Sequence, residues 1–160
     1  MSNEASSPSG DSQRTPSPRQ TDSPRRILVV DDDAFVRQLS TGVLIRSGFQ
    51  VDAAADGADA WNALQLASYD LLVTDHDMRR LTGVGLIQKV QAAHMALPVI
   101  LMSAQMPTDE LRTLPRLQID ATLRKPFTTG ELLGAVRTAL RTTDNSCEQI
   151  EPPANRAGPL

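Results

Sequence analysis

Five short apolar runs, separated by stretches with helical spacing, limit what this 160-residue chain can fold into. Each run has the length of a strand, and the stretch after it repeats apolar residues every three or four positions. The apolar runs are Ile27–Val30, Phe49–Ala54, Asp70–Thr74, Leu97–Met102 and Ile119–Leu123. The helical stretches are 34–47, 57–67, 84–94, 108–114 and a last one from Thr128 to about Arg141. Strands that alternate with helices predict an α/β domain whose parallel sheet is covered by helices on both faces.

Capping signals indicate where several of these helices begin and end. Asp33 stands directly before the first helical stretch, so its side chain is expected to cap that helix rather than to bind a metal ion. Gly48 follows the same stretch and is suited to end it. Thr128 and Glu131 have the spacing of a capping box at the start of the last helix. Pro115 is expected to cut the fourth helix short.

Composition divides the chain into one domain and two tails. Residues 1–26 hold seven serines and four prolines but only two apolar residues, and residues 142–160 have a similar character. Such segments bury too little apolar surface to offset the entropy lost on ordering, so both are expected to be disordered. Residues 27–141 hold nearly all the valine, isoleucine and leucine, and their length suffices for one core.

The overall charge and the rare residue types argue against several classes of function. The net charge is −3 and the chain has five aromatic residues, so no nucleic-acid-binding surface is expected. The single cysteine, Cys147, cannot form an internal disulfide, and a cytoplasmic protein is therefore the expectation. No apolar run approaches the ~20 residues of a membrane-spanning helix, and the start of the chain lacks the apolar segment of a signal peptide.

Polar side chains gather where the predicted strands end. The residues at these ends are Asp31, Asp32 and Asp33 after the first strand, Asp75 and Asp77 after the third, Ser103 after the fourth and Lys125 after the fifth. The carboxyl ends of parallel strands meet at one edge of the sheet, which is where such sheets bind ligands. We therefore expect one polar site that is assembled from four strand ends.

Several carboxylates at one edge repel one another and need a positive partner. A like-charged pair about 4 Å apart costs about 4 kcal/mol at an effective dielectric constant near 20. A hard divalent cation with oxygen ligands suits such a site, and Mg²⁺ is the expected ion. Together with the Lys125 ammonium and the Ser103 hydroxyl, the site could hold a phosphoryl group. Asp75, on the central strand, is best placed to accept that group as an aspartyl phosphate.

The segments at these strand ends resemble the receiver domain of bacterial two-component response regulators. The resemblance covers about residues 27–141, and four segments in order make it specific. They are Ile27–Asp33 (ILVVDDD), Tyr69–Asp75 (YDLLVTD), Leu97–Ala104 (LPVILMSA) and Leu123–Phe127 (LRKPF). The resemblance implies a flavodoxin-like three-layer sandwich with strand order 2-1-3-4-5 and five helices. It is closest to the stand-alone, single-domain type of response regulator, since neither tail has the pattern of an output domain.

The resemblance also implies how the acidic residues act. Asp75 would accept a phosphoryl group from a phosphohistidine of a sensor histidine kinase or a histidine phosphotransfer protein. Asp32 would bind Mg²⁺ directly, with Asp31 close by or acting through water. Asp75 itself and the backbone carbonyl of Asp77 would complete the protein ligands of the ion.

Two further residues would connect phosphorylation to an output. Ser103 would move toward the new phosphoryl group, and Lys125 would bridge its oxygens, followed by Pro126 in a cis peptide. These new contacts could bias a two-state surface made of the fourth helix, the fifth strand and the fifth helix. The output would be binding to an unknown downstream protein or passage of the phosphoryl group along a relay. Whether two chains form a dimer through the same surface is not decided by the sequence.

Three features depart from the usual receiver pattern. Thr122 stands where the family often has an aromatic residue, so the usual inward rotation of that side chain is in doubt. Arg79 and Arg80 replace a Pro-Gly loop and could dock an acidic partner, partly counter the acidic site or be tolerated without a role. The fourth helix is short and is followed by Pro115, so its packing against the domain is expected to be unusual.

Two other functions are compatible with the sequence. A receiver-like interaction module could work without phosphorylation, and Thr122 gives that reading some support. The Asp75–Asp77 segment also fits the nucleophile motif of haloacid-dehalogenase-like phosphatases. Those enzymes need a further acidic pair after the lysine, and they give Asp31 and Asp32 no role. We therefore expect a signalling domain that modifies itself rather than an enzyme that acts on other substrates.

Overall fold

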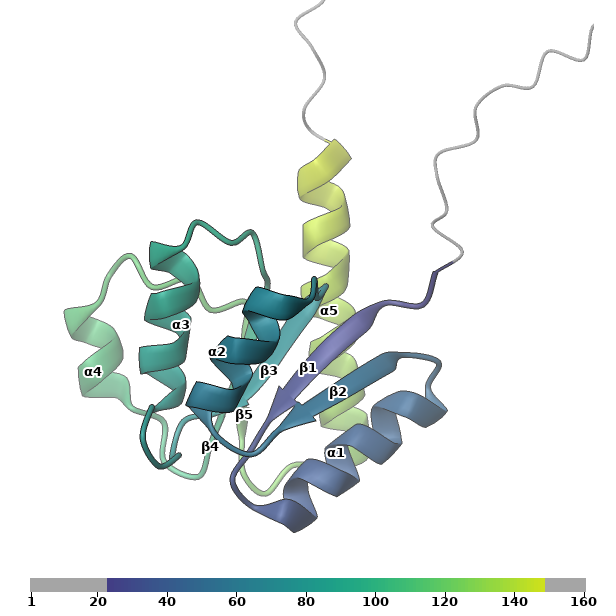
Figure 1. Cartoon of the computed structure of the whole chain (residues 1–160), viewed down its shortest axis with the longest axis horizontal. Coiled ribbons are helices and arrows are strands. Elements are labelled where there is room, and N and C mark those ends of the chain that lie inside the picture. Colours follow the sequence, from purple (N-terminus) through teal and green to yellow (C-terminus); the bar gives the residue numbers. More distant parts are fainter. Residues whose placement is uncertain (1–22, 149–160) are drawn as a thin grey trace, which may run out of the picture.

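A five-stranded parallel sheet forms the middle layer of the computed structural model, which describes residues 23–148 (Figure 1). Its strands are β1 (Arg26–Val30), β2 (Gln50–Ala54), β3 (Leu71–Asp75), β4 (Val99–Ser103) and β5 (Ala121–Arg124). All neighbouring strands pair in parallel, in the order β2-β1-β3-β4-β5. The flavodoxin-like strand order expected from the sequence is therefore confirmed, with β3 at the centre.

Helices cover both faces of this sheet. They are α1 (Ala34–Arg46), α2 (Gly57–Leu66), α3 (Gly83–Ala92), α4 (Thr108–Thr113) and α5 (Thr129–Glu148). Helices α1 and α5 lie on one face, α2 and α3 lie on the other, and α4 lies beside α3 (Figure 1). Among the residues described, no helix combines the length and the apolar character that crossing a bilayer requires.

The two faces of the sheet bury two separate apolar cores. Successive side chains of a strand point to opposite faces, so Ile27 and Val29 of β1 pack with α1 and α5. Leu28 and Val30 of the same strand pack with α2 and α3. Because both faces are covered, the central strands are apolar at consecutive positions instead of alternating with polar residues.

The expected capping interactions hold the helix ends in place. The Asp33 carboxylate accepts hydrogen bonds from the first turn of α1, including one of 2.8 Å from the Phe35 N–H. Gly48, after the end of α1, has a φ of 95°, a conformation that glycine adopts without strain. The Thr128 N–H donates to the Glu131 carboxylate (2.7 Å), and the Glu131 N–H donates to the Thr128 hydroxyl (3.1 Å). The predicted capping box is thus confirmed.

Helix α5 is longer than the sequence predicted. It continues past the expected end at Arg141 as far as Glu148, so residues 142–148 are helical rather than part of a disordered tail. No glycine or proline interrupts the chain between Arg141 and Pro152, and composition alone therefore gave no true stop signal. All the other predicted elements agree with the structure to within two residues at each end.

The domain also begins earlier than predicted. Arg26, which lies in the tail expected from composition, is the first residue of β1, and its N–H donates to the Asp70 carboxylate (2.7 Å). The neighbouring Arg25 pairs with Asp144 of α5 at 2.6 Å. The Arg26 guanidinium pairs with Asp52 of β2. These two ion pairs, with carboxylates distant in the sequence, compensate the arginine charges that are typical of a solvated tail. The rest of both predicted tails, 1–22 and 149–160, lies outside the described residues.

Candidate functional site

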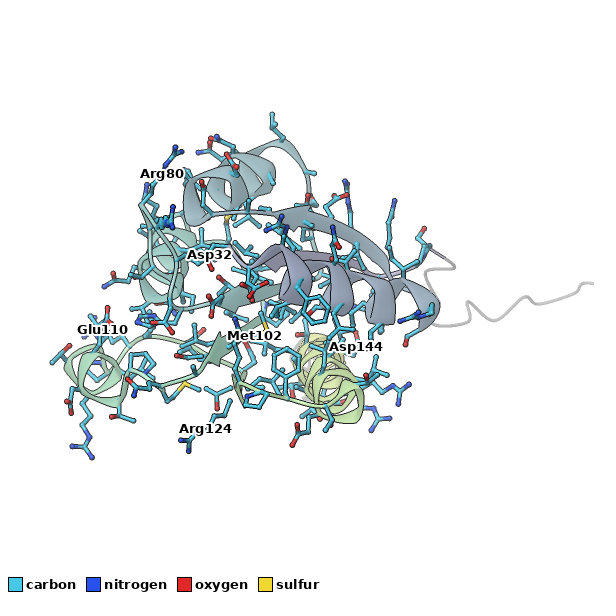
Figure 2. The ribbon with its side chains drawn as sticks, turned by 90° about the horizontal axis from the view of Figure 1, so that it is seen from below. Asp32, Arg80, Met102, Glu110, Arg124 and Asp144 are labelled. Carbon is cyan, nitrogen blue, oxygen red and sulfur yellow. The ribbon has the colours of Figure 1, made fainter. Side chains whose placement is uncertain are left out.

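The carboxyl edge of the sheet brings several of the predicted site residues together, and Figure 2 labels one of them, Asp32. Asp31 directly follows β1, Asp75 ends β3, Ser103 ends β4, and Lys125 directly follows β5. The Lys125 N–H donates to the Ser103 carbonyl oxygen (2.9 Å), so the pairing of β4 with β5 continues beyond the last strand residue. The backbone of the sheet therefore fixes where each of these side chains begins.

Three carboxylates form the acidic part of the site. Asp31, Asp32 and Asp75 each offer one oxygen, and these oxygens all lie within 4.8 Å of one another. Asp31 and Asp75 are buried, whereas Asp32 is exposed. The geometry thus combines two carboxylates shielded from water with one at the mouth of the site, open to an incoming ligand.

This oxygen cluster fits a hard divalent cation. Mg²⁺ is usually held by one or two carboxylates together with water and phosphate oxygens. Apart from an ion pair with Lys125, Asp75 Oδ1 has no hydrogen-bond partner within residues 23–145, although it is buried. A buried carboxylate oxygen whose one close partner is an ammonium shared with Asp31 has room for a further ligand. Asp31, Asp32 and Asp75 are therefore the side chains that would hold the ion.

Lys125 supplies positive charge from the opposite side of the site. Its ammonium lies 2.7 Å from Asp31 Oδ2 and 3.1 Å from Asp75 Oδ1. The lysine reaches these carboxylates from β5, although 94 residues of chain separate it from Asp31. The three residues form a compact charged group that carries more negative than positive charge.

The excess of negative charge affects the pKa of Asp75. Burial raises the pKa of this carboxyl above its ordinary value, the charge of Asp31 raises it further, and Lys125 opposes both effects. For Lys125, burial acts to lower the ammonium pKa, but the ion pairs with Asp31 and Asp75 outweigh it and raise the pKa overall. The ionised form of Asp75 is thus disfavoured by its surroundings, and a bound cation would offset this effect.

Ser103 lies at the same edge, but its hydroxyl is bonded to the following loop. Ser103 Oγ lies 2.6 Å from the Gln105 carbonyl oxygen and 3.2 Å from Asp77 Oδ2, and it accepts from the Gln105 N–H (3.2 Å). The Asp77 side chain is exposed and lies outside the three-carboxylate cluster. A ligand role for the Asp77 backbone carbonyl stays a prediction, as does movement of Ser103 toward a phosphoryl group.

The structure adds two contacts that the sequence reading missed. Arg37 donates to the backbone carbonyl of Asp31 (2.7 Å) and so braces the acidic loop from the first turns of α1. The one sequence feature that could have indicated this contact is the position of Arg37 one helical turn after the capping residue Asp33. His76 is mostly buried, and its Nε2 lies 3.5 Å from the Glu110 carboxylate of α4. No sequence pattern links His76 to Glu110, because the pair depends on the docking of α4.

Lys125→Ala is expected to lower the free energy of unfolding by about 3 kcal/mol in the absence of divalent cations. The substitution leaves the buried carboxylates of Asp31 and Asp75 without the ammonium that pairs with both. Mg²⁺ should recover much of this loss, because an ion bound by the same carboxylates replaces the missing charge. Urea unfolding with and without Mg²⁺ measures both effects.

Lys89→Ala is the matched control for this experiment. Lys89 is the other lysine of the chain, lies exposed on α3 and sits 5.6 Å from the centre of the Trp61 ring. Its removal should change the free energy of unfolding by less than about 1 kcal/mol, with or without Mg²⁺. Equal losses for the two variants would show that Lys125 does not balance the buried carboxylates.

Comparison with known proteins points to one family. Residues 27–137 match the family described as response regulator receiver domain. A probable transcriptional regulator, ycf27, from Cyanophora paradoxa is 34% identical over 121 residues, which cover 76% of this chain and 50% of that protein. The transcriptional regulatory protein PrrA from Mycobacterium tuberculosis is 35% identical over 129 residues, covering 78% of this chain and 55% of PrrA. The chain therefore spans about half the length of the curated relatives that it matches.

Solved structures agree with this match. The chemotaxis response regulator CheY4 of Vibrio cholerae superposes with a TM-score of 0.67 at 26% identity, over 74% of this chain and 100% of CheY4. The receiver domain of the Francisella response regulator 1452 gives a TM-score of 0.66 at 28% identity, over 74% of this chain and 98% of that domain. Both likenesses lie in the part of the chain that carries the sheet and the carboxylate site.

Proposed function

The chain belongs to the response regulator receiver domain family, and on that premise we propose that Asp75 accepts a phosphoryl group from a phosphohistidine. The donor is a sensor histidine kinase or a histidine phosphotransfer protein. The phosphorylated domain then changes its binding to another protein or passes the phosphoryl group to a further histidine. In this proposal the chain is a signalling domain that modifies itself, not an enzyme that turns over external substrates.

One observation carries the proposal. A buried carboxylate, Asp75, ends the central strand with a lysine ammonium 3.1 Å away and two further carboxylates within ion-binding distance. A phosphoryl group brings several negative oxygens to the nucleophile, so the site needs positive charge in place before transfer. Lys125 supplies part of this charge, and the Asp31, Asp32 and Asp75 oxygens would hold Mg²⁺ for the remainder.

The transfer is a direct displacement at phosphorus. An oxygen of the Asp75 carboxylate attacks the phosphorus, and the bond from phosphorus to the imidazole nitrogen of the donor breaks. The electron pair of that bond returns to the nitrogen, and the product on this chain is a mixed anhydride, aspartyl phosphate. Bound Mg²⁺ supplies charge neutralisation for the phosphoryl oxygens. Lys125 keeps its ammonium beside the oxygens that gain charge.

Ser103 and the α4 region couple this step to the surface. Once a phosphoryl oxygen is present beside Asp75, the Ser103 hydroxyl gains a charged acceptor that competes with the Gln105 carbonyl oxygen and Asp77. Moving the hydroxyl would release its bonds to the loop that leads to α4, and His76 contacts Glu110 in the same helix. A contact that forms only in the phosphorylated protein can shift the equilibrium between two conformations of this surface.

The location, the partners and the oligomeric state of the protein stay predictions. We place the domain in the cytoplasm with protein partners and without direct contact to nucleic acid or membrane. Stand-alone action remains an expectation, because the chain spans about half the length of relatives named as transcriptional regulators. Dimer formation through α4, β5 and α5 is a further expectation.

A second candidate is a receiver-like module that works without phosphorylation. Position 122 on β5 is an exposed threonine. In similar domains an aromatic side chain commonly stands there and reports phosphorylation to that face, and this chain lacks it. The module would use the unmodified surface for binding. Phosphorylation of Asp75 therefore decides between the two candidates.

Intact mass after incubation with acetyl phosphate tests the proposal. We expect the wild-type chain to gain the mass of one phosphoryl group in the presence of Mg²⁺ and little or none when the ion is chelated. Circular dichroism of the same sample confirms that the protein is folded. A folded chain that gains no phosphoryl group with Mg²⁺ present would favour the phosphorylation-independent module.

A further inference from the structure

We propose that Arg79 and Arg80 capture the phosphate group of small anionic phosphodonors beside the phosphoacceptor site. This inference rests on the proposed function and adds to it a specificity for donors such as acyl phosphates. The arginines would bind the donor and raise its local concentration, while Asp75 and Lys125 carry out the transfer. The two residues are therefore specificity determinants rather than catalytic residues.

A pocket at the mouth of the site supplies the space. Its lining residues are Asp32, Ala55, Asp56, Arg79 and Arg80, which come from the loops after β1, β2 and β3. The pocket has a volume of about 390 Å³, within the range of small-molecule sites. Asp32 is at once a wall of this pocket and a member of the three-carboxylate cluster. An anion held by the arginines would therefore lie next to the site that receives its phosphoryl group.

The backbone of the β3–α3 loop is anchored to the domain, and both of its arginines are exposed. Met78, directly before them, is buried, and the Leu81 N–H donates to the Arg79 carbonyl oxygen (2.8 Å). Arg80 has a φ of 67°, which is unfavourable for a long side chain and is usually left to glycine or asparagine. The loop thus keeps a charged residue at a position where local backbone preference disfavours it. Figure 2 shows Arg80 at the outer edge of the molecule, farther out than Asp32.

The two guanidinium groups are largely free to bind an anion. Within residues 23–145, Arg79 has no ion-pair partner, and Arg80 makes only a loose contact of 3.6 Å with Asp56 while 73% of its side chain is exposed. Neither arginine pairs with the carboxylates of Asp31, Asp32 or Asp75 in the described structure. They therefore make no direct ion pair with the acidic cluster. Guanidinium donors form paired hydrogen bonds with phosphate oxygens, and two of them suit a dianionic donor.

The chemistry of transfer fits this placement. An Asp75 oxygen attacks the phosphorus of acetyl phosphate, and the bond from phosphorus to the acyl oxygen breaks. Acetate leaves with the electron pair of that bond, and aspartyl phosphate forms. The arginines hold the donor before this step and take no part in bond making. Their removal should therefore change how the rate depends on donor concentration rather than the rate at saturation.

The test compares two double variants that lose the same charge. Arg79→Ala with Arg80→Ala removes the proposed anion site. Arg137→Ala with Arg141→Ala removes two exposed arginines of α5, which line neither the pocket nor the acidic cluster. Initial phosphorylation rates are measured against acetyl phosphate concentration, at low ionic strength and with Mg²⁺ saturating. We expect the first variant to need about three- to tenfold more donor for half-maximal rate, with the maximal rate unchanged. The second variant should match the wild type within about twofold.

A binding measurement keeps the inference separate from the proposed function. Inorganic phosphate is titrated into wild type and variants while the backbone amide signals of residues 78–82 are followed by NMR. We expect saturable shifts in the wild type and in the α5 variant, and their loss in the Arg79 and Arg80 variant. If the wild type is never phosphorylated but shows these shifts, the proposed function fails and the anion site stands.

Other outcomes would overturn the inference. Equal donor dependence in the wild type and the Arg79 and Arg80 variant would mean that the arginines do not select the donor. Equal effects of the two double variants would assign the change to net charge. Tighter Mg²⁺ binding in the first variant, with an unchanged donor dependence, would mean that the arginines only offset the acidic cluster.

Discussion

Asp75→Asn is expected to reduce phosphorylation by acetyl phosphate to less than about one per cent of the wild-type rate, because the amide that replaces the carboxylate is a far weaker nucleophile. The side chain keeps its size, so the surroundings of the site are preserved. The substitution should not lower the free energy of unfolding. Burial and the charge of Asp31 raise the pKa of the Asp75 carboxyl, so the folded state gains no stability from ionising it. A neutral isostere removes that unfavourable charge.

Asp77→Asn is the control for this substitution. It makes the same chemical change in the same loop, but its carboxylate is exposed and lies outside the cluster of Asp31, Asp32 and Asp75. We expect this variant to retain phosphorylation within about tenfold of wild type, since it keeps the Asp77 backbone and alters only the contact of the side chain with Ser103 and its charge near Asp75. Intact-mass time courses with Mg²⁺ compare the three proteins. Full-rate labelling of Asp75→Asn would disprove the assignment of the phosphoacceptor.

Gly83→Ala is expected to destabilise the domain by about 3 kcal/mol. Gly83 is the first residue of α3 and packs against the end of β3, where a Cβ atom would overlap the Asp75 carbonyl oxygen. It would also come within 2.9 Å of His76 Cα and of a Leu101 methyl group. Two of these neighbours are backbone atoms of the central strand and the residue after it, which cannot turn aside as a flexible side chain could. Relief of the overlap must therefore move α3 or the end of β3, and with it Asp75.

Gly134→Ala provides the matched control. Gly134 lies in the interior of α5, is exposed, and has open space where the new methyl group would stand. Because glycine is a poor residue within a helix, alanine should raise the free energy of unfolding by about 0.5 to 1 kcal/mol. In urea unfolding, Gly83→Ala should therefore lower the free energy of unfolding relative to wild type, and Gly134→Ala should raise it. A Gly83→Ala variant as stable as wild type would show that α3 does not pack closely on β3.

Local signals in the sequence predicted much of this fold. The apolar runs located the strands because both faces of the sheet are buried, and the caps at Asp33, Gly48 and Thr128 formed as expected. The strand order was not available from such patterns and came from the resemblance to receiver domains. The candidate site could be predicted because Asp31, Asp75, Ser103 and Lys125 all stand at strand ends, which parallel pairing brings to one edge.

Contacts between distant segments explain what the sequence did not predict. Arg25 and Arg26 belong to the domain because Asp144 pairs with the Arg25 guanidinium and Asp70 accepts the backbone N–H of Arg26, and neither partner is near in sequence. The bonding of Ser103 to Gln105 and Asp77 depends on how the loop after β4 turns. The contact between His76 and Glu110 depends on where α4 docks. Such pairings require three-dimensional placement, which residue patterns along the chain do not contain.

Chemical trapping of the phosphorylated residue tests the central claim most directly. Borohydride reduces an aspartyl phosphate to homoserine, so the wild-type protein is incubated with acetyl phosphate and Mg²⁺, reduced, digested and analysed by peptide mass. The account predicts homoserine at position 75 and at no other aspartate, with none formed when Mg²⁺ is chelated. Homoserine at Asp31, Asp32 or Asp77, or a phosphoryl group that survives reduction on a serine or threonine, would contradict it.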